Sequence, residues 1–568
     1  MKTYQQKPLI TVGIFLLAAL LPGSASGMSA IGAIAKAIKY TFKIADACTN
    51  EAHDKQMYIT TNTQLEDYSG LFEKTGKDAV GILNIRISPS RVADSHLAYN
   101  SFIVKSDKSA YGYFHRDSGA AESSQMGGIF HTEFIVESTG SDEHWNVYNA
   151  VGVFNDVGTS LVSDWVKFDA NTINVQARGN ARAYGIAAGG NFDIPVINND
   201  IDVVSDYNSA YGVYVLSQSG GSRMSQIGAG NDINVRVRAG RTPGWTQESM
   251  AAGVYLNSAY LGEIAGTADS PVKITAQNEG LSDNDTAVGV FVADGSNLER
   301  GVSHANITAK SQGDFAVGIG VYGENGTAHI GQIRDVDVKV SSERGRAVAL
   351  LFDGNYTMDG SISGSFEVKS HGDVFGYSFG RDVSGWHSSS EGGIAFYNGY
   401  TKDSTGLAID YGNVRIDITS YGASSDAEGN SAYGAYVAEG IKLDDNFGFV
   451  GNVNTSGLGY GIYNCGEIGD LNLQANVFAQ GGTAYGIYAA GGNGDTFKSS
   501  ISSLKEGGFI RVENNGSLGD AYGIYLDKGA SIGNIAADLK VANAKRGYGI
   551  YVEQGASVGD ISGDIAIS

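Results

Sequence analysis

The chain has 568 residues, of which 61 are acidic and 39 basic, and its formal net charge is −22. A nucleic-acid partner requires a basic footprint, so this charge excludes that partner class and favours a soluble, extended surface protein. Gly reaches 80 residues without the three-residue period of collagen, and recurrent aromatic segments exclude disorder.

Residues 1–27 have the features of an export signal. Lys2 and Lys7 begin the segment, and the apolar run from Leu9 to Leu21 is too short to span a membrane. Gly23-Ser-Ala25 then supplies the small residues of a cleavage site. A membrane anchor is the alternative, although the run is short for one. We therefore expect an exported protein.

Residues 28–75 are expected to cap one end of the fold. Ile31, Ile34, Ile38 and Phe42 recur at helical spacing, which predicts an amphipathic helix over residues 29–43. A cap is needed because an open solenoid end exposes both the core and the strand edges. A membrane-active helix is the alternative for this segment.

Residues 76–568 repeat one phrase, Tyr-Gly-Ile/Val-Tyr. Neighbouring copies, such as those at Tyr433 and Tyr460, stand 27 residues apart, and a period of this size is typical of a solenoid. Clear copies begin at Tyr211, Tyr460, Tyr485, Tyr522 and Tyr548, and degenerate copies at Tyr111, Tyr184 and Tyr433. More divergent copies begin at Val80, Val151, Ala252, Val288, Val317 and Val348, with Phe375 and Thr405 as candidates for two more.

Each repeat unit predicts three short strands. After Tyr522–Leu526 comes a turn, a second phrase at Ser531–Ile535, and a polar–apolar alternation at Asp538–Val541. Three strands in fixed order predict an all-β fold, a right-handed parallel β-helix of about 16 coils. A β-propeller or an array of small β-domains is the alternative, but propeller blades run nearer 40 to 50 residues. The repeat continues in mid-unit to Ser568.

These features together resemble the passenger region of bacterial autotransporters, over residues 76–568. The resemblance rests on the export signal, the acidic Gly-rich composition, and coils such as Tyr522–Tyr525 and Val558–Ile561. It implies a β-helical passenger that crosses the outer membrane with the help of a C-terminal β-barrel or another outer-membrane partner. Because the coil repeat reaches Ser568, a truncated reading frame and a stand-alone secreted solenoid are the alternatives.

Catalytic groups on a β-helix would be carboxylates gathered on one face, as polysaccharide lyases and glycoside hydrolases require. The candidate pairs are Asp200/Asp202, Asp283/Asp285, Asp335/Asp337 and Asp444/Asp445. Repeating polar positions on strands generate such pairs automatically, so we expect no enzyme, with a polysaccharide-degrading enzyme as the alternative. His115, His131 and His144 match no metal motif, and we expect neither a metal nor a cofactor.

Two tryptophans in irregular segments are the candidate binding residues. Trp245 ends the stretch Arg241-Thr-Pro-Gly-Trp245, and Trp386 lies in Val383-Ser-Gly-Trp-His387. Tryptophan beside polar groups suits stacking on sugar rings or a protein contact, whereas packing of the loop itself is the alternative. The prediction is an adhesin-like or structural protein of the cell surface, outer membrane or medium, with a host-surface glycan or protein as its ligand.

Overall fold

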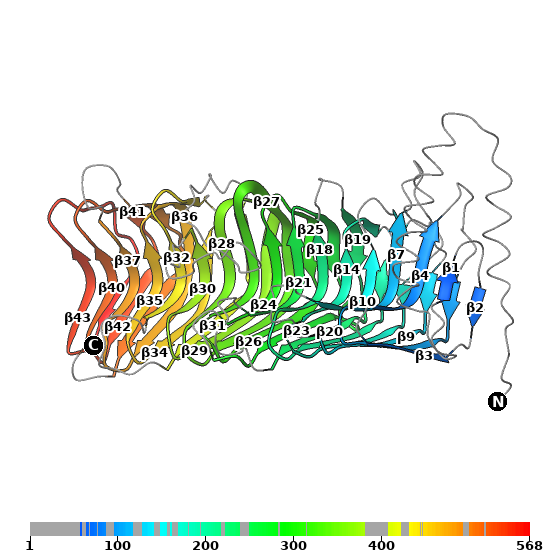
Figure 1. Ribbon diagram of the computed structural model, residues 1–568. Helices are drawn as coiled ribbons and strands as arrows, with labels where there is room; N and C mark the ends of the chain where they lie inside the picture. The colour runs from blue at the N-terminus through cyan, green and yellow to red at the C-terminus, as the bar shows by residue number, and fades with distance from the viewer. Residues whose placement is uncertain are drawn as a thin grey trace, which may run out of the picture.

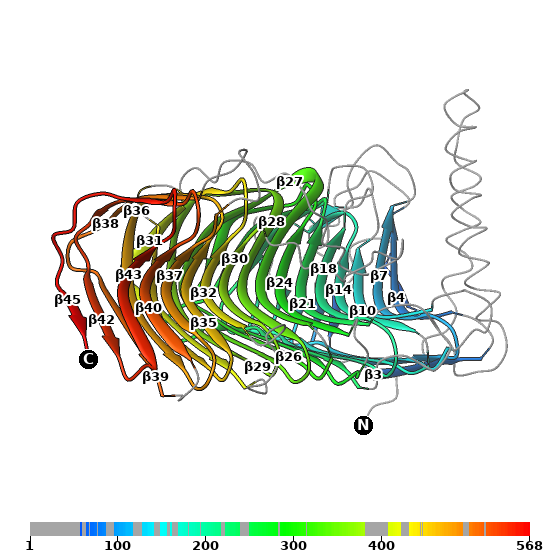
Figure 2. The ribbon, with the colours of Figure 1, turned by 90° about the vertical axis from the view of Figure 1, so that its left-hand side faces the viewer.

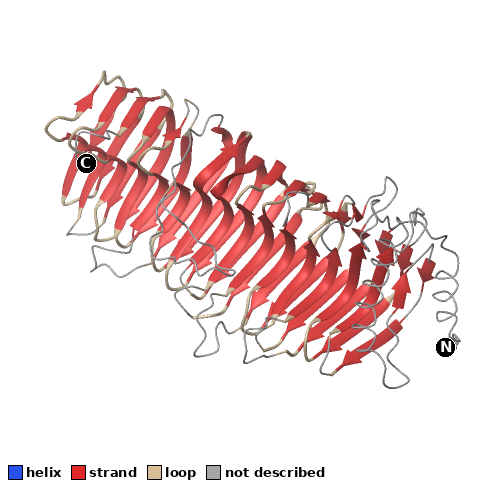
Figure 3. Cartoon of the chain, turned by 45° about the horizontal axis from the view of Figure 1, so that its top comes forward, coloured by secondary structure: helices blue, strands red, loops and turns tan. Residues whose placement is uncertain are grey.

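The computed structural model describes residues 57–568 with interruptions, of which those of seven residues or more are 87–95, 118–127, 141–147, 239–248, 381–406, 422–430 and 492–498. The expected export signal and amphipathic helix lie outside the described residues. All regular structure in the described part is strand, and the strands stack into an elongated solenoid (Figures 1 and 3). No helix long and apolar enough to cross a membrane occurs among these residues.

Each coil contributes strands to three faces, and each strand pairs in parallel with its counterparts in the neighbouring coils. The first face consists of β1 (Met57–Ile59), β4 (Ala79–Arg86), β7 (Ala110–Asp117), β10 (Asn149–Asn155), β14 (Arg182–Ala188), β18 (Ala210–Leu216), β21 (Met250–Asn257), β24 (Thr286–Ala293), β30 (Val374–Phe379), β32 (Ser431–Val437), β35 (Leu458–Asn464), β37 (Ala484–Ala489), β40 (Asp520–Leu526) and β43 (Arg546–Val552), together with parts of β27 and β28.

The second face carries shorter strands. It consists of β2 (Gln64–Glu66), β5 (His96–Ala98), β8 (Gly128–Phe130), β11 (Ser160–Leu161), β12 (Phe168–Asp169), β15 (Asn191–Phe192), β16 (Val196–Ile197), β19 (Arg223–Ile227), β22 (Tyr260–Ala265), β25 (Asn297–Ser303), β33 (Lys442–Leu443), β38 (Ser500–Leu504), β41 (Ser531–Ile535) and β44 (Ser557–Val558).

The third face alternates between buried and more accessible residues. It consists of β3 (Ser69–Lys74), β6 (Ser101–Ser106), β9 (Glu133–Ser138), β13 (Thr172–Ala177), β17 (Asp200–Ser205), β20 (Asp232–Val237), β23 (Val272–Asn278), β26 (Ala305–Ser311), β34 (Gly448–Thr455), β39 (Phe509–Asn514), β42 (Asp538–Ala542) and β45 (Ile565–Ile567). Longer strands turn corners: β27 (Phe315–Ser342) follows all three faces, β28 (Arg346–Met358) the first and second, and β29 (Gly360–Ser370), β31 (Leu407–Ser420) and β36 (Glu467–Ala479) the second and third.

The parallel β-helix predicted from the repeat is confirmed, with sixteen first-face strands or strand segments in the described residues. Fifteen of them carry a copy of the phrase, and all fifteen align in register, including the divergent copies. Thr405, the other candidate copy, lies outside the described residues, and the strand of Phe375 pairs directly with the strand of Tyr433. Met57–Ile59 in β1 already pairs with β4, so coil strands occur inside the range 28–75 that was expected to form the cap.

Glycine at the second position of the phrase allows the first and third faces to approach each other. A Cβ atom on Gly253 would lie 2.1 Å from Cγ2 of Ile274 in β23 and 2.6 Å from the carbonyl oxygen of Gly289 in the next coil. Real side chains do not tolerate such contacts, so this column excludes nearly every other residue. Ala349 is the one exception among the aligned copies.

The two aromatic positions of the phrase form a double ladder on the outer side of the first face. Here ring centroids of consecutive residues lie 4.9 to 5.2 Å apart, and the rings are close to parallel. We call this ladder the tyrosine ribbon, and it consists of Tyr433, Tyr460, Tyr485, Tyr522 and Tyr548 in one column and Tyr436, Tyr463, Tyr488, Tyr525 and Tyr551 in the other. The two columns meet edge to face within each coil. The first-face strands bend along their length (Figure 2).

Buried asparagines form a second ladder, at the corner before the third face. Asn199 accepts hydrogen bonds from the backbone N–H of Asn171 at 2.9 Å and from its Nδ2 at 3.0 Å, and it donates from Nδ2 to Oδ1 of Asn231 at 3.0 Å. The same Nδ2 group also lies within hydrogen-bond distance of the carbonyl oxygens of Phe168 and Ile197. The ladder therefore satisfies the polar groups of a corner that is closed to solvent.

We expect Asn199→Ala to lower the free energy of unfolding by about 3 kcal/mol, because it leaves the buried backbone N–H of Asn171 without its acceptor and removes the side-chain bonds to Asn171 Nδ2 and Asn231 Oδ1. Asn234 provides the matched control, since its side chain is exposed and bonds to Asp232 in its own strand. Urea unfolding followed by far-ultraviolet circular dichroism measures both variants. Equal stability of the two variants would contradict a structural role for the ladder.

Candidate functional site

The two predicted binding residues, Trp245 and Trp386, lie outside the described residues, and their role stays a prediction. Of the carboxylate pairs, Asp200/Asp202 on β17 and Asp335/Asp337 on β27 lie on different coils, with Asp200, Asp202 and Asp335 exposed and Asp337 half-buried. Asp285 is buried and accepts a hydrogen bond from the Ser249 hydroxyl. Asp283 and Asp444 lie outside the described residues.

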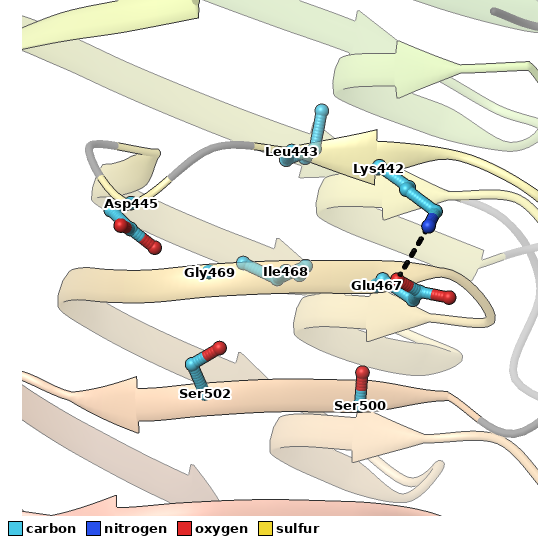
Figure 4. A pocket seen from close by; sticks show the side chains of 8 residues that line it. All are labelled: Lys442, Leu443, Asp445, Glu467, Ile468, Gly469, Ser500 and Ser502. Atoms are coloured by element: carbon cyan, nitrogen blue, oxygen red, sulfur yellow. Dashed lines mark ion pairs between the residues drawn. The ribbon is translucent and has the colours of Figure 1, made fainter. Parts of the chain in front are cut away.

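Asp445 is the predicted carboxylate that the structure places in a groove. The groove has a volume of about 490 Å³ and crosses the second face at β33, β36 and β38. Its lining residues are Lys442, Leu443, Asp445, Glu467, Ile468, Gly469, Ser500 and Ser502 (Figure 4). Leu443 and Ile468 belong to the core, so their strands are anchored from below and present the polar side chains outward.

Register between the coils assembles the polar wall of this groove. Lys442 stands opposite Glu467, and Glu467 stands opposite Ser500. Lys442 Nζ and Glu467 Oε2 are 3.1 Å apart, and both side chains remain about half exposed. An ion pair this accessible contributes little to stability, so its groups are available for a ligand at small cost to the fold.

Glycine forms the floor of the groove where the loop of Asp445 lies on β36. A Cβ atom on Gly469 would lie 2.3 Å from Oδ1 of Asp445 and 2.7 Å from its backbone nitrogen, so only glycine permits this approach. The backbone N–H of Asp470 donates to Asp445 Oδ1 at 3.2 Å, and Lys505 Nζ donates to the Asp445 carbonyl oxygen at 2.8 Å. These bonds fix the carboxylate at one end of the groove.

Polar columns extend the groove along the solenoid axis. One column continues from Glu467 and Ser500 to Ser531 and Ser557. A second, parallel column contains Asp470, Ser503 and Asn534, and the Ser503 hydroxyl donates to Asp470 Oδ1 at 2.7 Å. Hydroxyl, amide, ammonium and carboxylate groups in rows offer many weak hydrogen bonds to a ligand that is itself rich in hydroxyl groups.

The tyrosine ribbon has a different chemistry. Its ring faces are stacked on one another, so along most of the ribbon only ring edges and hydroxyl groups face outward. Tyr525 donates to Glu553, and the Tyr488 hydroxyl lies 3.4 Å from Asp527 Oδ2. The ribbon therefore stabilises the first face and offers little ring surface on which a sugar could stack.

Cys465 lies in the turn directly after β35, and its thiol is free. Burial, with a smaller effect of the nearby Glu439 carboxylate, raises the pKa of the Cys465 thiol to about 11. The thiol is therefore neutral at physiological pH and poorly nucleophilic. Cys48 lies outside the described residues.

Sequence reasoning missed Lys442, Glu467, Ser500 and Ser502. The second phrase of the repeat, at Ile468–Leu471, marks the strand of Glu467, but it did not show which polar residues of other coils become neighbours of Glu467. The described residues hold no cluster of three or more His, Cys, Asp or Glu side chains arranged for a metal ion. A scan against protein families and a search of curated proteins found no match for this chain.

Proposed function

We propose that the chain is an exported bacterial β-solenoid that acts at the cell surface, as an adhesin-like or structural protein similar to autotransporter passengers. The expected export signal supports the location, and the coil phrases support the likeness to passengers. A host-surface glycan or protein is the proposed ligand, and a β-barrel or other outer-membrane partner is the proposed means of delivery.

The observation that carries a binding role is the groove at Lys442, Glu467 and Ser500 with its polar columns. These columns run along the solenoid axis on strands held by the core, so they form a preorganised track rather than an isolated pocket. A rigid track of hydrogen-bonding groups suits an extended chain with repeated hydroxyl groups, because each coil offers a similar set of contacts. We therefore infer that a glycan chain occupies this track.

Glycan binding by the purified full chain tests this proposal. We expect binding to a subset of immobilised host and bacterial glycans, and we expect Lys442→Ala with Glu467→Gln to weaken it at least tenfold. Because both side chains are exposed, the double variant should fold normally. The matched control removes another exposed ion pair, Lys369–Glu367 on the third face, and should leave the affinity unchanged. Equal loss in both double variants, or no glycan bound by the wild type, would overturn the proposal.

A second candidate function is cleavage of a polysaccharide in the same groove. The observation that favours it is the presence of two carboxylates, Asp445 and Glu467, beside the ammonium groups of Lys442 and Lys505. General acid and base groups of this kind are what glycan cleavage requires. Release of reducing ends by the wild type, and its loss in Glu467→Gln with binding retained, would establish this function in place of simple attachment.

A further inference from the structure

Leu71, Ile103 and Ile135 form a short row of aliphatic residues on the outer side of the third face, and we call this row the apolar stripe. The three residues stand in register on β3, β6 and β9, near the N-terminal end of the described solenoid (Figure 1). Phe102 and Val104, on either side of Ile103, point into the core, so alternation along the strand directs Ile103 away from it. The apolar stripe therefore contributes nothing to the core of the solenoid.

The rest of this column has a different composition. From Asn174 on β13 to Lys540 on β42, each of the next twelve strands or strand segments carries a polar or charged residue at the position that aligns with Ile135. The third face thus forms without an aliphatic residue at this position. A row of outward apolar side chains with a polar border is typical of a surface on which another segment docks.

Carboxylates border the apolar stripe on both sides. Glu133 lies in the outward column before it, and Glu73 and Glu137 lie in the outward column after it, with Lys105 between them. Glu137 already pairs with Lys105 at 3.5 Å and with Arg178 at 2.8 Å. The other two carboxylates favour an occupant that carries basic groups beside its apolar side chains.

We propose that residues 29–43 of this chain, which lie outside the described residues, dock on the apolar stripe as the amphipathic helix that their spacing predicts. This contact is independent of the groove and of the glycan proposed for it. Ile31, Ile34, Ile38 and Phe42 recur on one side of the expected helix. This side is about 16 Å long, and the three strands of the stripe span about 10 Å, so a helix along the solenoid axis covers the whole stripe.

The basic residues of the segment and the length of the connecting chain fit this position. Lys36, Lys39 and Lys43 recur at spacings of three and four, so they lie along one edge of the expected helix, where they can face the bordering carboxylates. Phe42 precedes Met57, the first residue of β1, by 15 residues, which span up to about 50 Å when extended. The segment therefore reaches all three coils, and its tether favours it over a second copy of the chain.

Hydrogen exchange of the full chain, followed by mass spectrometry, tests this contact. We expect the amides of residues 29–43 to be protected in the wild type at every protein concentration. Ile103→Asp with Ile135→Asp should raise their exchange rates at least tenfold, because two carboxylates then replace the apolar surface. The double variant should keep the fold, since Asp202 occupies the same column. Ile135→Asn, which repeats the residue of the next coil, is a milder variant for the case in which the double variant unfolds.

The matched control is Thr275→Asp with Thr308→Asp, which places two carboxylates in register in the same column, on β23 and β26. It should leave exchange in residues 29–43 unchanged. Equal exchange in the wild type and in both stripe variants would overturn the proposal. Protection that appears only at high protein concentration would make a second copy the occupant, and protection that appears only with vesicles of phosphatidylglycerol would assign the helix to a membrane surface; either result contradicts docking within the chain.

Discussion

Gly253→Ala is expected to destabilise the solenoid by about 3 kcal/mol or more, although it adds a single methyl group. The new Cβ atom would lie 2.1 Å from Ile274 Cγ2 and 2.6 Å from the carbonyl oxygen of Gly289. The side chain of Ile274 can shift, but the oxygen belongs to the backbone of the next coil and is held by the ladder. The contact between the new Cβ atom and this oxygen can therefore be relieved only if the two coils move apart.

Urea unfolding by circular dichroism measures this effect, and Ala349→Gly is the matched control in the same column. Ala349 is fully buried, and its removal costs strand entropy and a methyl contact, so we expect a loss of about 1 kcal/mol. A second variant, Gly253→Ala with Ile274→Ala, relieves only the side-chain contact and should remain less stable than wild type. A Gly253→Ala protein as stable as the wild type would refute the steric argument.

Alkaline solution is expected to unfold the chain steeply above pH 10, because ionised tyrosines are incompatible with the tyrosine ribbon. Burial, followed by the charges of neighbouring groups, raises the pKa of Tyr522 to about 12 and also raises those of Tyr460, Tyr463 and Tyr488. Below pH 10 these tyrosines are protonated in both the folded and the unfolded chain, so their contribution to stability is fully present.

Between pH 10 and the higher pKa values of the folded state, only the unfolded chain releases the phenolic protons. The unfolded state then binds fewer protons than the folded state, so the free energy of unfolding falls as pH rises. Each such tyrosine adds up to about 1.4 kcal/mol per pH unit to the slope. Absorbance at the tyrosinate band and far-ultraviolet circular dichroism should therefore change together.

Tyr460→Phe isolates this effect, because it keeps the stacked ring and removes one ionisable group from the middle of the ribbon. We expect its stability at pH 7 to match that of the wild type and its alkaline midpoint to rise. Tyrosinate absorbance that develops near pH 10 while the circular dichroism signal stays unchanged would show that the rings ionise without leaving the stack, contrary to the expectation.

The repeat phrase predicted most of the fold because nearly every coil requires a glycine at the same position for steric reasons. A recurring glycine can be recognised directly in the sequence. Even Ala252 and Val288, which replace the first tyrosine, were aligned correctly through their neighbouring glycines. The strands of Phe375 and Tyr433 pair directly although the two residues stand 58 positions apart, so the spacing between paired strands varies widely along the chain.

The outward position of both tyrosines could not be predicted from alternation. In a straight strand, residues three apart such as Tyr485 and Tyr488 would point to opposite sides. The structure instead directs Gly486 and Ile487 inward and both tyrosines outward, where their rings are 5.2 Å apart. Gly486 faces Ile510 and Val512, which lie in another strand and are not its neighbours in sequence.

The groove also could not be predicted from the sequence, although Asp445 was one of the candidate catalytic carboxylates. Lys442, Glu467 and Ser500 become neighbours only through coil register, and the separations along the chain are 25 and 33 residues. The unequal separations arise from turns of different length. A single repeat period therefore predicts where the strands lie. It does not predict correctly which side chains of neighbouring coils stand opposite each other.

The direction of the backbone hydrogen bonds has a mechanical consequence. Parallel strands stacked coil upon coil place these bonds along the long axis, and each coil bonds only to its neighbours. Tension applied to the two ends loads the junctions between coils in series, so the rod yields at its weakest junction, whatever its length. Added coils extend the reach of such a rod without adding to its tensile strength.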